Sequence, residues 1–445
     1  MNPTMQEEEE ARPSKKARPD PAAGSGLTPF ALRLAKQLSN SKGKGDNLVF
    51  SPLSVYAALA LVAAGARGET LGELLALLGA SSRDELAEFA GGAAERALAD
   101  RSGSGGPLVA FACGVWHAET VALKPDYRAA AVESYKAETR AADFHGTPEE
   151  ARKEINRWVS EATNGLITSI LPEGSVHPET AMVLANAIYF KGMWFHPFDK
   201  EETKMKLFYC LDGSSVRVPF MRSDRWQFVE EHDGFKVLKL PYRMQQPQSG
   251  TSPRDRTYRA RSGRGGNVDE CHYEKSDECP TNPDERPRLS MCVFLPDDRK
   301  GLPSLVDKMS SSPSFLQDHL PTRRFPVTKF RLPKFKFSLS SKMNDVLKAM
   351  GLKVAFDKHK ADLSDMLMDD GGMFMENVFH EAVIEVNEEG TEAAASTACT
   401  TVKKCAAPTP VDFVADHPFA FFVVEEVSGA IIFMGYCINP ATRVE

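Results

Sequence analysis

The feature that most constrains the fold of this sequence is residues 388–410, EEGTEAAASTACTTVKKCAAPTP, which have the composition of a strand but no anchor for a core. From Gly390 to Val402 every residue except Glu392 is small or β-branched. Thr and Val favour pleated strands, and with a period of two residues one face of this strand carries no charge. One interpretation is a flexible surface loop. The other is a loop that would lower its free energy by joining a β-sheet, and that stores strain which cleavage can release.

Three apolar patterns predict strands elsewhere in the chain. Residues 181–190, AMVLANAIYF, are almost entirely apolar, which favours a central strand covered on both faces. Residues 378–388 alternate, and His380 lies on the apolar face, where a buried core histidine is a better interpretation than a catalyst. Residues 419–436 contain two apolar runs around EEVSG, which is typical of a hairpin.

Capping residues predict two helix starts. Ser51, followed by a proline, predicts a helix that continues through apolar residues to Gly65. The sequence TPEE at 147–150 predicts a second helix that opens with a capping box and ends at Asn164.

Composition and charge exclude several classes of protein. The 445 residues are 42% hydrophobic and 26% charged, as expected for a globular chain. A formal net charge of -7 is poorly suited to neutralising phosphates over a broad surface, so we do not expect a nucleic-acid partner. No apolar run is long enough for a bilayer, and no secretory signal is recognisable. The eight scattered cysteines suggest free thiols in a reducing compartment.

Two segments fall outside these patterns. Residues 1–25 are predicted to be a disordered tail, in which KKAR at 15–18 is either a nuclear-import signal or a solvated charge run. Residues 244–287 are rich in Arg, Ser, Gly, Pro and Asp and are predicted to be a disordered insertion. Its arginines favour a solvated loop, with an acidic partner or nucleic acid as the alternative. Its Cys271, His272 and Cys279 do not have the spacing of a standard zinc site, so no metal is expected.

Motifs of the common enzyme classes are not found. The sequence has no G-x-S-x-G turn, no P-loop and no G-x-G-x-x-G after a strand. We therefore expect a protein that is not an enzyme and uses no cofactor.

The stretch VIEVNEEGTEAAA at 383–395 closely resembles the hinge of the serpin family, and the resemblance extends over residues 26–440. It is carried by six further stretches, NLVFSPLSVYAALALVAAGA (47–66), INRWVSEATNGLI (155–167), LANAIYFKGMWFHPFD (184–199), FRLPKFKF (330–337), DFVADHPFAFFV (412–423) and FMGYCINP (433–440). The resemblance implies one α+β serpin domain over 26–440, with three β-sheets, about nine helices and an exposed reactive-centre loop at 388–410. Residues 441–445 would be a short tail.

The resemblance also implies a mechanism of suicide inhibition. A protease attacks the loop as a substrate, and after acylation the loop inserts into the main sheet and carries the trapped enzyme with it. In the family the attacked residue lies sixteen positions after the first hinge glutamate. With Glu388 in that place, the reactive bond is Lys404–Cys405, and cleavage after Lys403 is an alternative. The hinge residues that must enter the sheet are then Glu388, Gly390, Thr391, Ala393, Ala394 and Ala395.

The resemblance assigns roles to several buried residues. In the region called the shutter, His380 is expected to hydrogen-bond Asn186 near Ser51 and Ser54. In the breach, where the loop first enters the sheet, Trp194 is expected, with an ion pair between Lys334 and Glu388.

The expected partners are proteases. A lysine at the reactive bond suits trypsin-like serine proteases, and the resemblance to plant-type serpins adds papain-like cysteine proteases and metacaspases. We expect a monomer that forms a covalent complex, binds no membrane, and is intracellular, in the cytoplasm or the nucleus, with unconventional release outside the cell as the alternative. Two other functions stay open: a non-inhibitory serpin that serves as a binding or nuclear interaction protein, and an inhibitor switched by oxidation of Cys399 or Cys405.

Overall fold

The computed structural model describes residues 26–41, 45–244, 288–368, 372–389 and 409–441. Within these ranges the chain forms nine α-helices and three β-sheets. The helices are α1 (Leu27–Ser41), α2 (Pro52–Ala64), α3 (Gly68–Leu78), α4 (Arg83–Ala93), α5 (Pro125–Tyr135), α6 (Pro148–Ala162), α7 (Leu302–Ser310), α8 (Phe315–Asp318) and α9 (Asn344–Ala349).

The three sheets contain five, seven and four strands. The five-stranded sheet has the order β12 (Phe335–Lys342), β13 (Asn377–Val386), β4 (Met182–Lys191), β2 (Leu108–Ala118), β3 (Glu138–Ala142). The seven-stranded sheet has the order β1 (Leu48–Phe50), β16 (Ile431–Cys437), β15 (Phe419–Glu425), β9 (Leu289–Pro296), β8 (Phe235–Pro241), β7 (Gln227–His232), β10 (Arg324–Phe325). The four-stranded sheet has the order β14 (Phe413–Val414), β11 (Phe330–Pro333), β6 (Ser215–Met221), β5 (Lys204–Tyr209).

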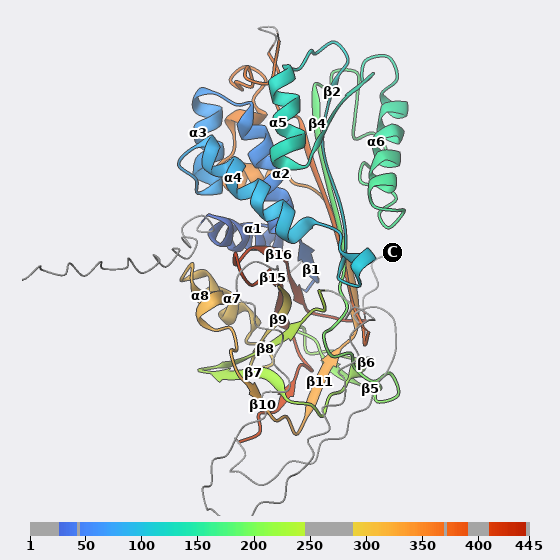
Figure 1. The fold of residues 1–445 in the computed structure, drawn as a ribbon, viewed down its shortest axis with the longest axis vertical. Helices are drawn as coiled ribbons and strands as arrows, with labels where there is room; N and C mark the ends of the chain where they lie inside the picture. Colours follow the sequence, from blue (N-terminus) through green and yellow to red (C-terminus); the bar gives the residue numbers. More distant parts are fainter. Residues whose placement is uncertain (1–25, 42–44, 245–287, 369–371, 390–408, 442–445) are drawn as a thin grey trace, which may run out of the picture.

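The five-stranded sheet lies between two layers of helix. Figure 1 shows α2, α4 and α5 on one side of β2 and β4, and α6 on the other side. Strand β4 is therefore buried on both faces: Leu184 and Ile188 pack into the main core, whereas Val183 and Ala187 pack into a smaller core that includes residues of α6. The prediction of a central strand at 181–190 is confirmed, because a strand covered twice needs apolar residues at nearly every position.

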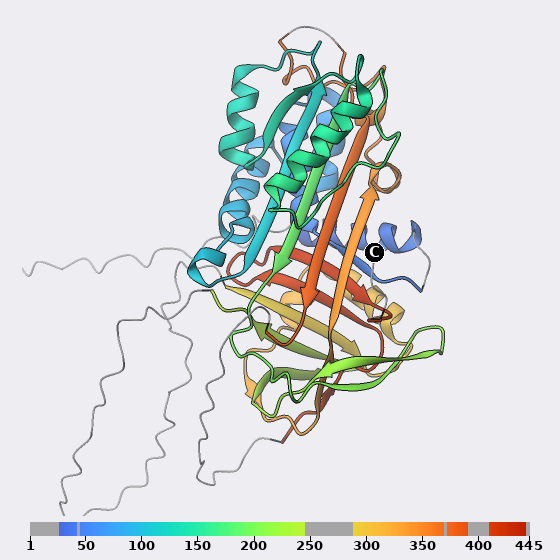
Figure 2. The same ribbon diagram turned by 90° about the vertical axis from the view of Figure 1, so that its right-hand side faces the viewer.

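The seven-stranded sheet supplies the centre of the main core. Figure 2 shows its strands crossing below the long strands of the five-stranded sheet. All seven residues of β15 and all seven of β16 are buried, and the two strands pair in antiparallel fashion. The hairpin predicted at 419–436 is thus confirmed.

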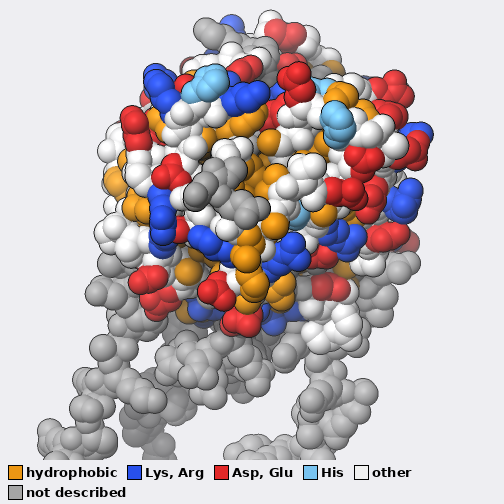
Figure 3. All heavy atoms as spheres, turned by 90° about the horizontal axis from the view of Figure 1, so that it is seen from above, with side chains coloured by type: hydrophobic (Ala, Val, Ile, Leu, Met, Phe, Trp, Pro, Cys, Tyr) orange, Lys and Arg blue, Asp and Glu red, His pale blue; other side chains and the backbone are white. Residues whose placement is uncertain are grey.

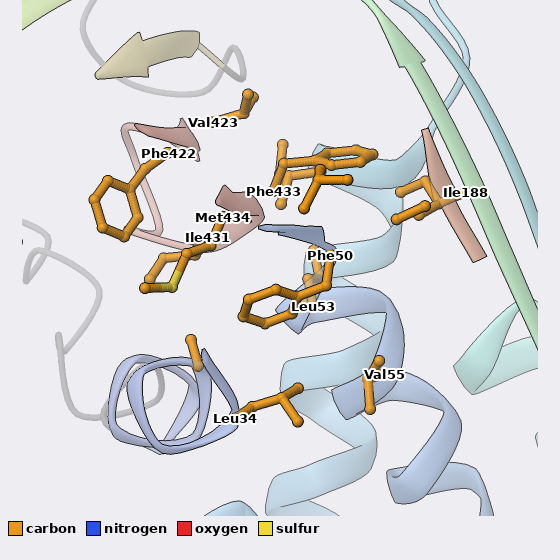
Figure 4. Close-up of a cluster of buried hydrophobic side chains, with 14 of the residues drawn as sticks. Leu34, Phe50, Leu53, Val55, Ile188, Phe422, Val423, Ile431, Phe433 and Met434 are labelled. Atoms are coloured by element: carbon orange, nitrogen blue, oxygen red, sulfur yellow. The ribbon is translucent and has the colours of Figure 1, made fainter. Parts of the chain in front are cut away.

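Charged residues of both signs cover the end of the molecule that carries α5. Figure 3 looks onto this end and shows acidic and basic side chains interspersed around a central group of hydrophobic ones. Inside the molecule, Figure 4 shows how β16 joins the layers: Phe433 and Met434 lie among Phe50, Leu53 and Ile188.

Both helices start where the sequence predicts, but only one start has the predicted cap: α6 begins at Pro148 after Thr147, without a side-chain capping hydrogen bond. Ser51 caps α2 as predicted, because its hydroxyl accepts a hydrogen bond from the amide of Ser54 at 3.2 Å. The capping box at 147–150 is wrong: Thr147 donates its hydroxyl to Asp143 at 3.2 Å, and Glu150 pairs with Lys153 at 2.8 Å. A preceding acidic residue and an i,i+3 lysine therefore replace the reciprocal cap.

The described ranges contain no helix long and apolar enough to cross a membrane, and no cluster of three His, Cys, Asp or Glu side chains able to hold a metal ion. Cys271, His272 and Cys279 lie outside these ranges. Four cysteines within them, Cys113, Cys210, Cys292 and Cys437, are free and buried. Burial raises the pKa of Cys113 and of Cys292 to about 12.

Candidate functional site

The candidate site is built around Asn387, Glu388 and Glu389, the last described residues before the loop. From here on, the word hinge means these three residues, which are the described part of the hinge segment that the sequence predicts. The hinge follows β13 directly, and the chain is described again from residue 409, shortly before β14. The other residues that the sequence assigns to the hinge and to the reactive bond lie outside the described ranges. They are Gly390, Thr391, Ala393, Ala394, Ala395, Lys403, Lys404 and Cys405.

Glu388 is held by two side chains from different parts of the chain. Lys334, just after β11, places its Nζ 2.8 Å from Glu388 Oε2, and the hydroxyl of Thr203 donates to Oε1 at 2.7 Å. Burial opposes ionisation of this carboxyl, but the hydrogen bonds from Lys334 and Thr203 outweigh burial and lower the pKa of Glu388. The hinge is thus fixed by a buried carboxylate, and the expected ion pair is present.

Trp194 holds the backbone of the hinge. Its indole Nε1 donates to the carbonyl of Asn387 at 2.8 Å, and its amide donates to the carbonyl of Glu389 at 3.2 Å. The indole stacks on Tyr242 with ring centroids 4.6 Å apart. Trp194 therefore does more than fill space, since two carbonyls at the start of the loop depend on it for their hydrogen bonds.

The sheet beside the hinge has a parallel seam. Strands β13 and β4 pair directly and in parallel, with His380 opposite Asn186, whereas β13 pairs with β12 in antiparallel fashion. We call this β4–β13 pairing the seam. Parallel pairing is slightly less stable per residue than antiparallel pairing.

Four polar side chains are buried together at the seam. His380 Nδ1 lies 2.9 Å from Asn186 Oδ1, and the amide of Ser51 donates to His380 Nε2 at 3.1 Å. The hydroxyl of Ser54 donates to Asn186 Oδ1, and Asn186 Nδ2 donates to the carbonyl of Ser54 at 3.2 Å. The expected hydrogen bond between His380 and Asn186 is present, and it joins the two strands across the seam.

These partners define the protonation state of the imidazole. Asn186 Oδ1 can only accept, and the amide of Ser51 can only donate, so Nδ1 carries the proton and Nε2 accepts. Burial lowers the pKa of His380 to about 3. A neutral, fully buried histidine of this kind is structural, which agrees with the interpretation drawn from the sequence.

Sequence reasoning missed three residues that complete the hinge. Thr203 donates to Glu388, Tyr242 stacks on Trp194, and the amide of Phe198 donates to the carbonyl of Glu388 at 2.8 Å. Thr203 and Phe198 lie in a region without periodic pattern, so only their place in the fold reveals them. Lys200 also forms an ion pair with Glu389.

The same chain matches a known protein family along most of its length. A sequence model of the family described as Serpin (serine protease inhibitor) matches residues 25–251 and 280–440. The chain belongs to the serpin family. Its relatives include Serpin-Z2A of rice (Oryza sativa subsp. japonica), 55% identical over 94% of this chain and 98% of the relative, and Serpin-Z1B of wheat (Triticum aestivum), 43% identical over 93% and 95%. It is thus a plant serpin-Z-like protein, and family membership supports protease inhibition as its function.

Solved structures agree with the fold. The structure of Arabidopsis AtSerpin1, described as a native stressed conformation, has a TM-score of 0.80 and 35% identity, over 95% of this serpin and 99% of that chain. Serpin48 of Tenebrio molitor has a TM-score of 0.73 at 24% identity, over 95% and 99%, and shows the fold alone. The α+β fold with three sheets is confirmed. The family match omits residues 252–279, which lie within the predicted insertion.

Proposed function

We propose that this serpin traps proteases covalently, by cleavage at Lys404–Cys405 followed by insertion of the loop at the seam. The observation that carries the proposal is the parallel pairing of β13 with β4. A loop that turns back from the end of β13 runs antiparallel to β13, and therefore antiparallel to β4 as well. Insertion at the seam replaces one parallel pairing by two antiparallel ones, which are more stable per residue.

The other edge of β13 does not offer this gain. Strand β12 is antiparallel to β13, so a strand inserted there would pair in parallel with β12. Insertion there would replace one antiparallel pairing by one antiparallel and one parallel pairing, which is a smaller gain than at the seam. The seam is thus the favoured place for the loop.

The hinge supports insertion because it fixes where the new strand starts. Trp194 and Lys334 hold Asn387 to Glu389 at the end of β13, which supports an inserted strand that starts beside the seam. If about fourteen residues insert at ~3.3 Å each, the acylated residue moves by roughly 45 Å. A protease attached there is carried far from its docking position, and distortion of its oxyanion donors stops deacylation.

The chemical step uses the protease's own nucleophile. Its Ser Oγ or Cys Sγ attacks the carbonyl carbon of Lys404, the bond from Lys404 to Cys405 breaks, and the new amino group of Cys405 takes the proton from the protease's base. The loop then stays joined to the enzyme as an ester or thioester. Lysine at this position favours a protease with an acidic specificity pocket, and trypsin-like serine proteases and papain-like cysteine proteases or metacaspases are the proposed targets.

The test is to mix the protein with trypsin and, separately, with papain, and to analyse the products on a denaturing gel. The expected result is an SDS-resistant band at the summed mass, with cleavage mapped after Lys404. Lys404→Ala should abolish the trypsin complex, while Lys403→Ala should retain it. Clean cleavage of the loop without a complex, by both enzymes, would contradict the proposal and favour the non-inhibitory alternative.

A second variant tests insertion separately from recognition. Thr391→Arg places a long charged side chain in the strand that must enter the sheet, so we expect cleavage without trapping. Thr391→Val is the matched control and should trap normally, because valine suits a buried strand. Full trapping by Thr391→Arg would show that this part of the loop does not insert.

A further inference from the structure

An apolar pair stands out on the surface of the four-stranded sheet. Met205 and Leu207 of β5 are 50% and 45% exposed. They are two residues apart and therefore lie on the same face of the strand. Of the seven large hydrophobic side chains that are exposed among the described residues, these are the two that share a strand. Scattered single exposures are ordinary, but an adjacent pair is a candidate contact surface.

The position of β5 connects this pair with the loop. Thr203, immediately before β5, hydrogen-bonds Glu388, where the loop departs. Tyr209, the last residue of β5, donates its amide to the carbonyl of Asp416 at 2.8 Å, a few residues after the loop returns. Strand β5 thus runs from one attachment of the loop toward the other. Figure 1 shows β5, β6 and β11 together at the lower end of the molecule, far from α5.

Two arginines share this face with the apolar pair, although the whole chain is acidic. Arg217 of β6 is directly opposite Leu207 in the antiparallel pairing, so their side chains lie on the same face. Tyr209 follows on that face, and the guanidinium of Arg299 lies over its ring, 3.6 Å from the centroid.

The two arginines have charge available for a partner. Both are exposed, and neither belongs to an ion pair within the described part of the chain. A partner for this surface needs an apolar centre with acidic side chains around it.

We propose that Met205, Leu207, Arg217 and Arg299 form a second docking surface for the target protease, separate from the reactive bond. This inference rests on the proposed function. An enzyme that holds the loop in its active site must approach the end of the molecule to which both ends of the loop are attached. The four side chains are available there to contact the enzyme outside its active site. The surface raises the rate of complex formation and contributes to the choice of protease, whereas loop insertion is unaffected by it.

Another occupant of the same surface would be a second copy of this chain. Strand β5 is at the edge of its sheet, and an edge strand with exposed apolar residues can pair with an identical edge. The arginines argue against this pairing, because two copies would bring like charges together. The protease is therefore the occupant that the charges favour.

The test compares second-order rate constants for complex formation with trypsin and with papain. The double variant Met205→Ser/Leu207→Ser should lower the rate constant about tenfold for a protease that the unchanged protein traps, with the same stoichiometry of inhibition. Arg217→Glu/Arg299→Glu should also lower it, with a smaller effect at high salt. Val132→Ser is the matched control, since Val132 of α5 is 58% exposed at the opposite end of the molecule and should leave the rate unchanged.

The outcomes separate this inference from the proposed function. No complex between the unchanged protein and either enzyme would mean that the proposed function has failed. Normal trapping at unchanged rates by both double variants would overturn the second docking surface alone. A dimer of the unchanged protein that becomes a monomer in Met205→Ser/Leu207→Ser, measured by sedimentation, would assign the surface to a second copy and also overturn the inference.

Discussion

Two glutamates, Glu425, which is buried, and Glu381, which is half-buried, show how differently the two large sheets are built. Glu425, at the end of β15 in the seven-stranded sheet, accepts hydrogen bonds from the amides of Arg288, Val427 and Ser428 and from the Ser428 hydroxyl. Glu381, on β13 in the five-stranded sheet, has an Oε2 that is buried and has no hydrogen-bond partner among the described residues. Burial raises the pKa of Glu381 to about 7, against an opposing hydrogen bond from Ser340.

The same contrast extends to the strands around these residues. Strands β15 and β16 are buried along their whole length and pair with antiparallel neighbours. At the seam, the pairing is parallel and its centre holds the polar pair His380 and Asn186. In the seven-stranded sheet these buried strands pair only in antiparallel fashion, whereas the five-stranded sheet retains a weaker parallel pairing and a carboxyl oxygen without a partner among the described residues. Under the proposed mechanism, these features favour the entry of a new strand, because the parallel pairing and the unpaired carboxyl oxygen make the closed sheet less stable.

The largest effect on the free energy of unfolding is expected in the seven-stranded sheet. Phe433 of β16 is fully buried and contacts Phe190 with ring centroids 5.8 Å apart. Phe433→Ala should lower the free energy of unfolding by about 3–5 kcal/mol, because it removes apolar contacts and leaves a cavity. Urea unfolding of the native state measures this loss, with exposed Val132→Ala as the control. A loss below about 1 kcal/mol would show that the seven-stranded sheet is not tightly packed around Phe433, and would remove its contrast with the five-stranded sheet.

The next effect tests the centre of the seam. His380→Ala removes the acceptor for the Ser51 amide and the donor to Asn186, and should cost about 2–4 kcal/mol at neutral pH. The folded-state pKa of about 3 lies below the ordinary value of 6.5, so the unfolded chain binds the extra proton more readily. The unchanged protein should therefore lose stability as the pH falls below 6.5, since a protonated Nε2 would face the Ser51 amide.

Urea midpoints between about pH 7 and pH 4, which span the ordinary pKa of histidine, provide the measurement for this prediction. His380→Ala should show a weaker loss on acidification than the unchanged protein. Parallel pH curves for the two proteins would mean that His380 does not carry the acid sensitivity of the seam.

Glutamine substitutions at Glu425 and Glu381 should have opposite effects on the free energy of unfolding. Glu425→Gln replaces one acceptor oxygen by a donor that faces other donors, and should destabilise by about 1–3 kcal/mol. Glu381→Gln removes a half-buried charge and should stabilise the native state by roughly 1–2 kcal/mol above pH 7, after allowance for its partial exposure.

The raised pKa of Glu381 makes the cost of its charge in the native state depend on pH. The penalty is absent below the ordinary value of 4.5, grows as the pH rises toward about 7, and is complete above that value. Urea midpoints at about pH 5 and pH 8, on either side of the raised pKa, should thus separate Glu381→Gln from the unchanged protein chiefly at the higher pH. Equal destabilisation by both glutamine variants would remove the distinction between the two sheets.

The smallest effect is expected at the hinge. Lys334→Met removes the cation from Glu388 but leaves the bond from Thr203, and the lysine side chain is 34% exposed. We expect a loss of about 1 kcal/mol, which disappears as the pH falls through the lowered pKa of Glu388 and the carboxyl becomes protonated. Lys336→Met, from a more exposed ion pair with Glu385, is the control and should change stability less. Equal effects of the two would mean that the hinge ion pair is an ordinary surface contact.

Prediction from the sequence succeeded where burial or capping acts on residues that are close together along the chain. Residues 181–190 are apolar at nearly every position because β4 is covered on both faces, and Ser51 caps α2 because its hydroxyl is beside the first free amides. The capping box at 147–150 failed because Asp143, outside the motif, competes for the Thr147 hydroxyl. The partners Thr203 and Tyr242 were missed because nothing in their local sequence indicates contact with a hinge so distant along the chain.

The sequence by itself determined the strand-like composition of the loop, the alternation of β13 and the family, because these depend on residue types and on periodicity along the chain. Only the tertiary structure decided that β13 pairs in parallel with β4, that His380 is neutral with its proton on Nδ1, and that one oxygen of Glu381 has no partner among the described residues. Each of these depends on which groups from distant segments meet in a buried space. Pairing, protonation and satisfaction of polar groups there are set by neighbours in three dimensions.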